Sequence, residues 1–148
     1  MQALVENKKA RFNYEILDKF EAGIELLGLE VKSIKNHQGS LEGAFVIIRG
    51  GEAYLIGAHI PPYQAKNTPE SYDPDRNRRL LLTKKEIREL AGYGEDRGLT
   101  IVPLSMYNKG VKIKVLIATV RGKKKYDKRE SIKKKETGRE LRRQMKEH

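Results

Sequence analysis

Residues 100–117 read TIVPLSMYNKGVKIKVLI and carry the strongest strand pattern in the chain. Apolar and polar residues alternate on both sides of Lys109-Gly110, which predicts two β-strands joined by a tight turn. One face of each strand is expected to point into a core, and this face carries Val102, Leu104 and Met106, then Val111, Ile113, Val115 and Ile117. The alternation ends at Arg121-Gly122, where the folded body is expected to end.

A second hairpin is predicted at residues 44–48 and 53–56. Both runs are rich in β-forming residues, and Gly50-Gly51 between them permits the positive φ angles of a tight turn. Upstream, residues 10–20 and 24–29 are interpreted as one long strand with a bend or bulge at Glu21-Ala22-Gly23, because glycine relieves backbone strain there.

Two short helices are also predicted. The first spans residues 29–35, with Val31 and Ile34 on one side; propensity alone barely favours helix over strand in this segment. The second begins at Thr83-Lys84-Lys85-Glu86, a capping box in which hydroxyl and carboxylate satisfy each other's backbone amides. Ile87, Leu90 and Ala91 form the apolar stripe of this helix. Gly92 or Gly94 is expected to end it.

These elements predict a mainly β fold of five or six antiparallel strands with two or three short helices. The prolines and acidic turn formers of residues 61–79 predict a loop without regular structure. A sheet of this size either packs against helices or closes to hide its edges. A closed barrel of the oligonucleotide-binding type, with about six strands, is the interpretation we prefer; composition alone is compatible with another α+β arrangement.

Positive charge is concentrated at the C-terminal end. The formal net charge is +11, and residues 121–148 hold 13 Lys and Arg against 5 Asp and Glu. The large aliphatic residues from 123 onward are only Ile132, Leu141 and Met145, too few to bury a core. We therefore expect a barrel domain at residues 1–121 and a basic tail at 122–148 that is disordered when free and helical against RNA.

The sequence offers no catalytic set. His37, His59 and His148 lack metal-ligand spacing, and the chain contains no cysteine, which fits a reducing cytosol. Asp73 and Asp75 flank a proline, where turn formation is a better explanation than a magnesium pair. The glycines match neither a Walker loop nor a Rossmann fingerprint. We predict a protein that is not an enzyme and needs no metal or cofactor.

Basic clusters instead predict binding to a polyanion, and RNA is the natural candidate. The clusters are Asn7-Lys8-Lys9-Ala10-Arg11, Arg76-Asn77-Arg78-Arg79, the strand pair Lys112 and Lys114, and Arg121 with Lys123, Lys124 and Lys125. Lys112 and Lys114 share one strand face, opposite its apolar face, and can follow a phosphate backbone. Tyr126 lies within the last cluster, where its ring could stack on a base.

A set of short segments follows in order along essentially the whole chain: Asn7 to Ala10, Phe20 to Ile24, Gly28 to Ser33, Gly51 to Ala53, Gly57 to Ile60, Asp73-Pro74 through Leu82, and Gly122 to Lys124 with Asp127-Lys128-Arg129. In their order and spacing these segments resemble the SsrA-binding protein (SmpB) family. The resemblance implies an oligonucleotide-binding-type barrel that binds the tRNA-like domain of tmRNA and replaces the anticodon arm. It further implies delivery to stalled 70S ribosomes, contact with 16S ribosomal RNA, and elongation factor Tu and alanyl-tRNA synthetase acting on the same complex.

The resemblance also assigns site residues. Matching motif positions imply RNA contacts at Asn7, Glu21, Leu81 and Lys114, with Lys32, Arg76 and Arg78 in support; the charge pattern adds Lys8, Lys112, Lys123 and Lys124. A carboxylate such as Glu21 can accept hydrogen bonds from base amino groups. The resemblance also implies that the tail lies in the decoding centre and the empty mRNA path of the ribosome, with contacts there from Tyr126, Asp127, Lys128, Arg129 and Ile132.

Some positions depart from the family pattern, and rival functions remain open. Asn108 stands where an aromatic is common, Tyr72 where the family is often polar, and Arg79 where lysine is usual. The main rival is a ribosomal protein or translation factor that binds ribosomal RNA through such a barrel. An RNA-modifying enzyme and a general single-strand binder are less well supported, the latter because aromatics are only 7%. With neither a signal-peptide-like start nor an apolar run of transmembrane length, a monomer in the cytoplasm is expected.

Overall fold

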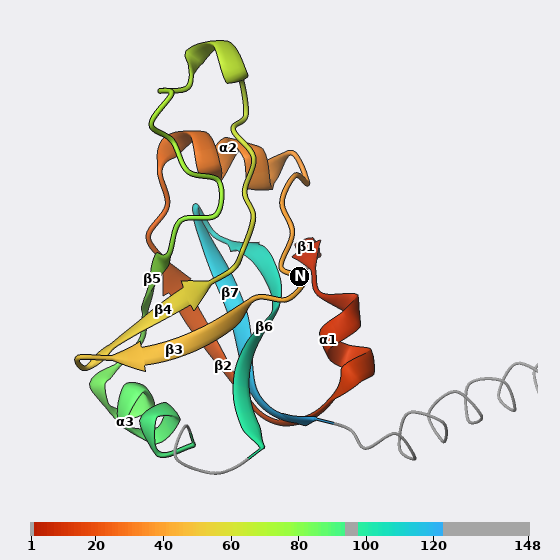
Figure 1. Cartoon of the computed structure of the whole chain (residues 1–148), viewed down its shortest axis with the longest axis vertical. Coiled ribbons are helices and arrows are strands. Elements are labelled where there is room, and N and C mark those ends of the chain that lie inside the picture. The colour runs from red at the N-terminus through yellow and green to blue at the C-terminus, as the bar shows by residue number, and fades with distance from the viewer. Residues whose placement is uncertain (1, 94–97, 123–148) are drawn as a thin grey trace, which may run out of the picture.

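Strands close into a ring in the computed structural model, which describes residues 2–93 and 98–122 (Figure 1). Within that part of the chain the strands pair in the order β6, β3, β4, β5, β2, β7, and β7 pairs again with β6, so the barrel is closed. β1 pairs with residues 105–107 of β6, beyond the point where β3 pairs with Ile101. The predicted barrel of about six antiparallel strands is confirmed. The elements are β1 (Ala3–Glu6), α1 (Lys8–Asn13), β2 (Tyr14–Ile24), α2 (Gly28–Lys35), β3 (Phe45–Arg49), β4 (Glu52–Ile56), a 3₁₀ turn (Ala65–Asn67), β5 (Arg78–Leu81), α3 (Lys84–Tyr93), β6 (Leu99–Lys109) and β7 (Lys112–Gly122).

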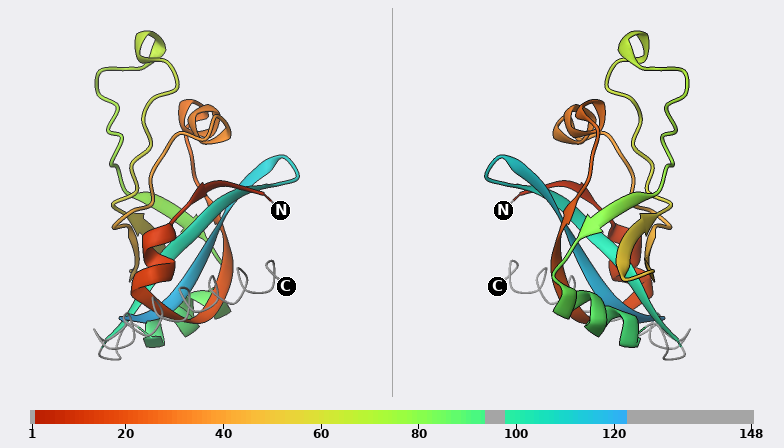
Figure 2. Two further views of the ribbon diagram at one scale, coloured as in Figure 1. Left: turned by 90° about the vertical axis from the view of Figure 1, so that its right-hand side faces the viewer. Right: turned by 90° about the vertical axis from the view of Figure 1, so that its left-hand side faces the viewer.

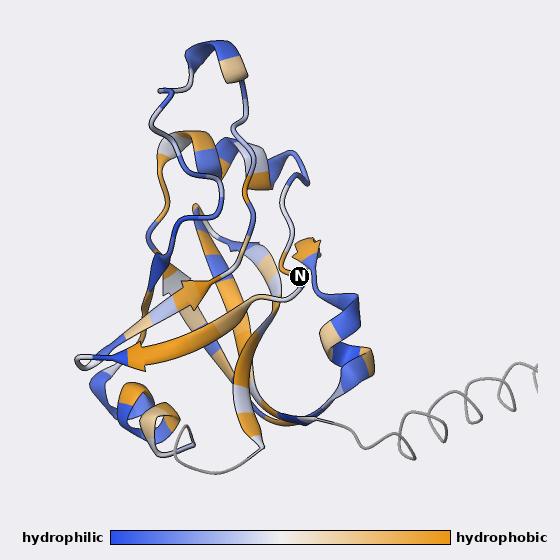
Figure 3. Ribbon diagram, in the orientation of Figure 1, coloured by the Kyte–Doolittle hydropathy of each residue, from blue (hydrophilic) through white to orange (hydrophobic). Residues whose placement is uncertain are grey.

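The core has two parts. The barrel interior is filled by apolar residues of all its strands, including Leu55, Leu80, Met106 and Ile117. A smaller cluster lies where α1 covers β6 and β7, and it contains Ala10, Val102, Leu104, Ala118 and Val120. Apolar residues accordingly gather along β3, β6 and β7 (Figure 3). The long strands β6 and β7 are buried on both faces where α1 covers them.

A register shift between Pro103 and Ser105 changes which face of β6 points inward. Val102 and Leu104 therefore pack under α1, whereas Met106 packs in the barrel. The prediction that these three share one face is wrong, because the bulge inserts an extra residue into the alternation. The predicted inward position of Val111 is also wrong: it lies in the hairpin turn and is 90% exposed.

The predicted long strand over residues 10–29 is wrong at both ends. Residues 8–13 form α1, and β2 ends at Ile24, after which the chain enters α2. The register shift lies between Ile16 and Asp18, and pairing with β7 is regular across residues 21–23. Gly23 serves close packing instead, since a Cβ there would lie 3.1 Å from the Cβ of Leu81.

Three other predictions are confirmed. The β3–β4 hairpin turns at Gly50 and Gly51, whose φ angles are 59° and 77°. Helix α2 matches the expected helix and begins one residue earlier, at Gly28. Helix α3 starts at the capping box, with the Thr83 amide donating to Glu86 Oε1 at 3.0 Å and the Glu86 amide donating to Thr83 Oγ1 at 3.2 Å. It ends at Tyr93, just before Gly94; its buried stripe is Ile87 and Leu90, while Ala91 is exposed.

The loop of residues 61–79 is less irregular than predicted. It contains the 3₁₀ turn, and its last two residues already belong to β5, which pairs with β2 and β4. The predicted tail, residues 122–148, lies outside the described residues from 123 onward. β7 runs up to Gly122, next to Tyr14.

Candidate nucleic-acid interface

The β6–β7 hairpin and the adjoining part of β2 bring charged residues together on the outside of the barrel. Tyr107 pairs with Lys114 across the hairpin, Lys109 with Lys112, and Lys114 also with Gly23 of β2. Side chains of paired residues lie on the same face of a sheet. The hairpin extends beyond the barrel in both side views (Figure 2), so this face is open to a large partner.

Glu21 is fixed in this cluster by two hydrogen bonds. Its Oε2 accepts from the Tyr107 hydroxyl at 2.6 Å, and its Oε1 accepts from Lys109 Nζ at 2.7 Å. Hydrogen bonds from Lys109 and then Tyr107 stabilise the charged form and lower the pKa of Glu21, although burial opposes them. A carboxylate offers about four acceptor positions, so it retains acceptor capacity for a further donor.

Tyr107 is buried beside this carboxylate. Burial, followed by the hydrogen bond to Glu21, raises the pKa of Tyr107 well above its ordinary value. Its hydroxyl therefore keeps its proton at neutral pH and remains the donor that holds Glu21 in place.

Next to Glu21 lies a hollow of about 330 Å³, which we call the hairpin hollow. Its predicted site residues are Leu81, which is 46% exposed, together with Lys112 and Lys114. The rest of its lining is apolar or glycine: Gly23, Ile24, Leu26, Val31, Val111 and Ile113. Four of the predicted site residues thus come together: Leu81, Lys112 and Lys114 in the hollow, with Glu21 two residues from Gly23 on the same strand.

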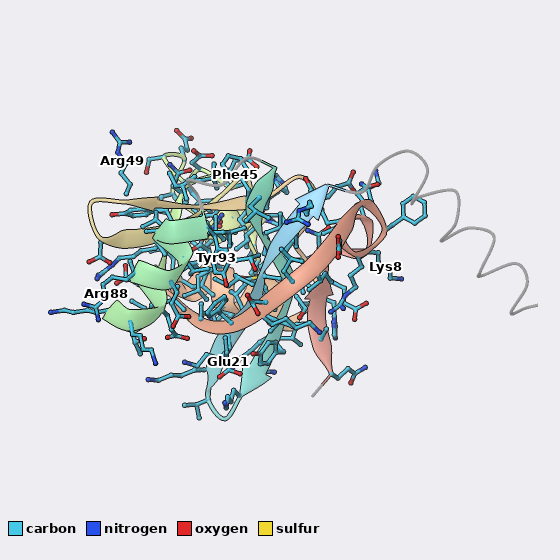
Figure 4. All side chains as sticks on the ribbon, turned by 90° about the horizontal axis from the view of Figure 1, so that it is seen from below. Lys8, Glu21, Phe45, Arg49, Arg88 and Tyr93 are labelled. Carbon is cyan, nitrogen blue, oxygen red and sulfur yellow. The ribbon has the colours of Figure 1, made fainter. Side chains whose placement is uncertain are left out.

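Asn7 has a different position. It is 4% exposed, accepts from the Ala10 amide at 3.2 Å as the N-cap of α1, and donates to the carbonyls of Leu41 at 3.1 Å and Pro103 at 2.9 Å. Its side chain thereby joins α1, β6 and the segment before β3. This burial does not agree with the predicted direct contact to RNA. Lys8, on the same helix, is exposed, and Figure 4 shows it on α1, away from Glu21.

Arg76 and Arg78 are committed to an internal ion cluster around Glu30 of α2. Arg78 is fully buried, donates from Nε to Glu30 Oε2 at 2.8 Å, and reaches the carbonyls of Ala58 and Pro74, each at 2.9 Å. Arg76 forms an ion pair with the other oxygen of the same carboxylate. In this structure Arg78 has no surface to offer to RNA, so the predicted contact is not supported at this position.

Glu30 remains charged despite complete burial. Burial raises the pKa of its carboxyl, but hydrogen bonds from Arg76, the Leu27 amide and Arg78 outweigh this effect, and the pKa lies below its ordinary value. Tyr72 also donates to this carboxylate at 3.1 Å and to the Ile60 carbonyl at 2.7 Å. The cluster therefore fastens the loop of residues 61–77 to α2.

The remaining predicted residues lie apart from the hairpin hollow or outside the described residues. Lys32 is exposed on α2. Lys123, Lys124, Tyr126, Asp127, Lys128, Arg129 and Ile132 fall outside the described residues. Sequence reasoning missed Lys109 and Tyr107 as site residues. The hairpin pattern could have indicated them, because Tyr107 and Lys109 pair with Lys114 and Lys112 across the turn and so share their outer face.

Some acidic and histidine side chains of the described residues form local contacts with each other. Among residues 2–93 and 98–122, no group of three or more His, Asp or Glu is placed to hold a metal ion. Asp73 Oδ1 accepts from the Asp75 amide at 2.9 Å, which is a turn contact, and Asp75 pairs with His59 at 2.7 Å. No helix in this part of the chain is long and apolar enough to cross a membrane.

Comparison with known proteins agrees with this arrangement. The family model for SmpB protein matches residues 4–147. The SsrA-binding protein of Thermosynechococcus vestitus is 47% identical over 147 residues, covering 99% of this chain and 97% of the relative. That of Gloeothece citriformis is 49% identical over 143 residues, covering 97% of this chain and 92% of the relative.

A solved structure is also similar. It is described as "tmRNA-SmpB: a journey to the center of the bacterial ribosome", and it matches with a TM-score of 0.69 at 44% identity over 86% of this chain and 92% of that chain. Both the sequence match and the shared barrel extend over most of the molecule. The chain therefore belongs to the SmpB family of SsrA-binding proteins.

Proposed function

We propose that this chain binds the tRNA-like domain of tmRNA and delivers that RNA to stalled ribosomes, where translation resumes on the tmRNA reading frame. The observation that carries the proposal is the hairpin hollow with Glu21 held beside it. The names of the relatives support the choice of partner: the curated ones are SsrA-binding proteins, and the solved one is described as tmRNA-SmpB in the bacterial ribosome.

The chemistry of the hollow suits a folded RNA. Lys112 and Lys114 can neutralise phosphates, which gives affinity without selectivity. Glu21 repels phosphate but accepts hydrogen bonds from base amino groups, so it favours places where a base edge is exposed. Leu81 offers an apolar surface on which a base or ribose can pack. A site of this kind selects one RNA shape over random RNA of equal charge.

The wider proposal assigns roles to the barrel and the tail. The barrel takes the place of the missing anticodon arm, and residues 122–148 enter the decoding centre and the empty mRNA path, becoming helical there. Tyr126, Asp127, Lys128, Arg129 and Ile132 make those ribosomal contacts, while Lys123 and Lys124 extend the RNA-binding surface. Elongation factor Tu and alanyl-tRNA synthetase act on the same RNA complex, and the protein works as a cytoplasmic monomer without catalysing a reaction.

Tagging of stalled nascent chains tests this function. A reconstituted translation system with mRNA that lacks a stop codon is supplied with alanyl-tmRNA, and tagged peptide is measured with and without the chain. The full chain should restore tagging. A chain without residues 123–148 should still bind the tRNA-like domain yet give no tagged peptide. Full tagging by the shortened chain would remove the role assigned to the tail; ribosome binding that needs no tmRNA would favour the ribosomal-protein rival.

A further inference from the structure

A second hollow lies on the side of α2 away from the barrel hairpin. It is shallow, measures about 430 Å³, and is lined by Lys32, Lys35 and Asn36 of the last turn and C-cap of α2 and by Tyr63 of the loop of residues 61–77, between β4 and β5. We call it the helix hollow. Its lining combines two cations, an amide and an aromatic ring, with no carboxylate among them.

The two lysines of the helix hollow are free to bind an anion. Within the described residues neither Lys32 nor Lys35 forms an ion pair, whereas Lys9, Lys109 and Arg79 each pair with a nearby carboxylate. Two unpaired ammonium groups one turn apart on a helix repel each other. A phosphate or another anion placed between them would relieve that repulsion.

Tyr63 is presented to solvent on a well-supported loop. Its side chain is 42% exposed. On one side, the Ile60 amide donates to the Pro74 carbonyl at 2.9 Å, and Tyr72 donates to the Ile60 carbonyl. On the other side, Thr68 Oγ1 donates to the Gln64 carbonyl at 2.6 Å, and Asn67 Nδ2 donates to Gln64 Oε1 at 2.8 Å. These bonds brace the backbone on both sides of Tyr63, and the ring shares one hollow with Lys32, Lys35 and Asn36 of α2.

The helix hollow adjoins the hairpin hollow across α2. Val31 lines the hairpin hollow and Lys32, the next residue, lines the helix hollow. Both side views show α2 between the β6–β7 hairpin and the loop of residues 61–77 (Figure 2). Two pairs of lysines, Lys112 with Lys114 and Lys32 with Lys35, thus line two hollows that adjoin across α2.

We propose that the helix hollow binds one unpaired RNA nucleotide, with its base stacked on Tyr63 and its flanking phosphates held by Lys32 and Lys35. Asn36 offers both a donor and an acceptor to the base edge. The ring favours a nucleotide over an acidic peptide, because every base has a face that stacks on an aromatic side chain. Glu30, Arg76 and Arg78 are positioning residues, since they hold the Tyr63 loop against α2. The inference rests on the proposed function and adds a second contact to it.

Substitution at Tyr63 tests the stacking directly. Affinity is measured for the full chain with the isolated tRNA-like domain of tmRNA, and separately for the protein–tmRNA complex with stalled 70S ribosomes, because the nucleotide can belong to either RNA. In one of these arms Tyr63→Ala should weaken binding about 5- to 50-fold, whereas Tyr63→Phe should stay within about twofold of the wild type. Phe45→Ala removes a ring of similar exposure on another face and serves as the control; it should leave both arms unchanged.

Charge substitutions test the binding of phosphate by the two lysines. Lys32→Gln/Lys35→Gln should lower the slope of log K against log salt by about 0.7 for each phosphate that the variant no longer neutralises. Lys84→Gln/Lys85→Gln removes the same charge from α3 and should leave the slope nearly unchanged. Equal effects of the two pairs, or equal affinities of Tyr63→Ala and Tyr63→Phe in both arms, would overturn the helix-hollow proposal alone. Failure of the wild type to prefer the tRNA-like domain would overturn the proposed function.

Discussion

At Glu21 a carboxylate lies among lysines on a surface that is expected to meet a polyanion. Its position depends on two partners from β6, which is separated from β2 by β7: Tyr107 and Lys109 hold one carboxylate oxygen each. Such an arrangement fixes the side-chain rotamer before any ligand arrives, so little entropy is lost on binding. A fixed acceptor discriminates between ligands, while the positive charges of Lys112 and Lys114 supply attraction.

Glu21→Gln is expected to weaken binding of the tRNA-like domain about 10- to 100-fold, because the contribution of a hydrogen bond to a charged acceptor is about 1.5–3 kcal/mol. The fold should persist, since the side chain lies on the outer surface of the barrel. Binding titrations and thermal unfolding measure the two effects. Glu25→Gln, which removes another exposed carboxylate paired with an arginine, is the matched control and should bind normally. Normal binding of the tRNA-like domain by Glu21→Gln would contradict the assignment.

The pKa of Glu21 gives a second prediction at this scale. It should titrate below its ordinary value of 4.5, and Lys109→Gln should move the pKa back toward that value, because the largest stabilising hydrogen bond is lost. Since folding lowers this pKa, the stabilising contribution is complete above the ordinary value and is lost as pH falls through the folded-state value. Side-chain carboxyl chemical shifts followed by NMR measure it. An unchanged midpoint in Lys109→Gln would show that the lysine does not hold the carboxylate in solution.

At the scale of elements, α2, β5 and the loop of residues 61–77 are joined by one buried charge cluster. Glu30 lies 46 residues before Arg76 and 48 before Arg78, yet both guanidinium groups meet its carboxylate. Glu30 and Arg78 could not be buried without each other, because an isolated charge in the interior is very costly. The cluster fixes the angle at which α2 and its loop meet the barrel.

Arg78→Met should destabilise the protein by about 3–5 kcal/mol, because Glu30 would lose a buried partner. Chemical denaturation measures this change in the free energy of unfolding. Arg79→Met is the matched control one residue along the same strand; Arg79 pairs with Glu25 and Glu52 at the surface, and its loss should destabilise the protein far less than the loss of Arg78. Equal costs at both positions would mean that burial of Arg78 does not matter.

The Glu30 pKa is also lowered on folding, so the cluster should weaken only at acid pH.

Local patterns predicted those elements whose cause is local. The Gly50-Gly51 turn and the Thr83–Glu86 capping box lie within a few residues of what they determine, and both were predictable. Helix α1 was not, because its N-cap, Asn7, is held by carbonyls 34 and 96 residues away. The bulge in β6 was also missed, since alternation of apolar residues does not reveal an inserted residue. Buried Arg78 looked like a surface cation because its partner is remote in sequence.

The candidate site divides in the same way. Lys112 and Lys114 followed from the strand period alone, whereas Glu21 and Leu81 were assigned by family resemblance. Their grouping beside one hollow depends on β2 pairing with both β5 and β7. Tyr63 had no local signal, because its place next to Lys32 and Lys35 arises from the loop that Glu30 anchors. The contacts assigned to the tail residues stay predictions.

For the whole molecule, closure of the sheet explains how a small chain presents several separate surfaces. In the described residues each strand of the barrel has a paired neighbour on both sides, so the barrel has no open edge strand that could pair with another chain. α1 covers one side, α2 and its loop stand over one end, and the β6–β7 hairpin extends beyond the body (Figures 1 and 2). The RNA contacts proposed for the hairpin hollow can therefore be tested by mutation separately from those proposed for α2 and for the tail after Gly122.

Selective recognition of the tRNA-like domain is the central claim, and one measurement tests it most directly. The purified full chain is titrated with that RNA across a salt series, with unstructured RNA of equal length as competitor. Phosphate attraction alone weakens steeply with salt and is shared equally by both RNAs. We predict tight binding that resists the competitor at physiological salt. Binding that is shared equally between the two RNAs and disappears as salt rises would contradict the account.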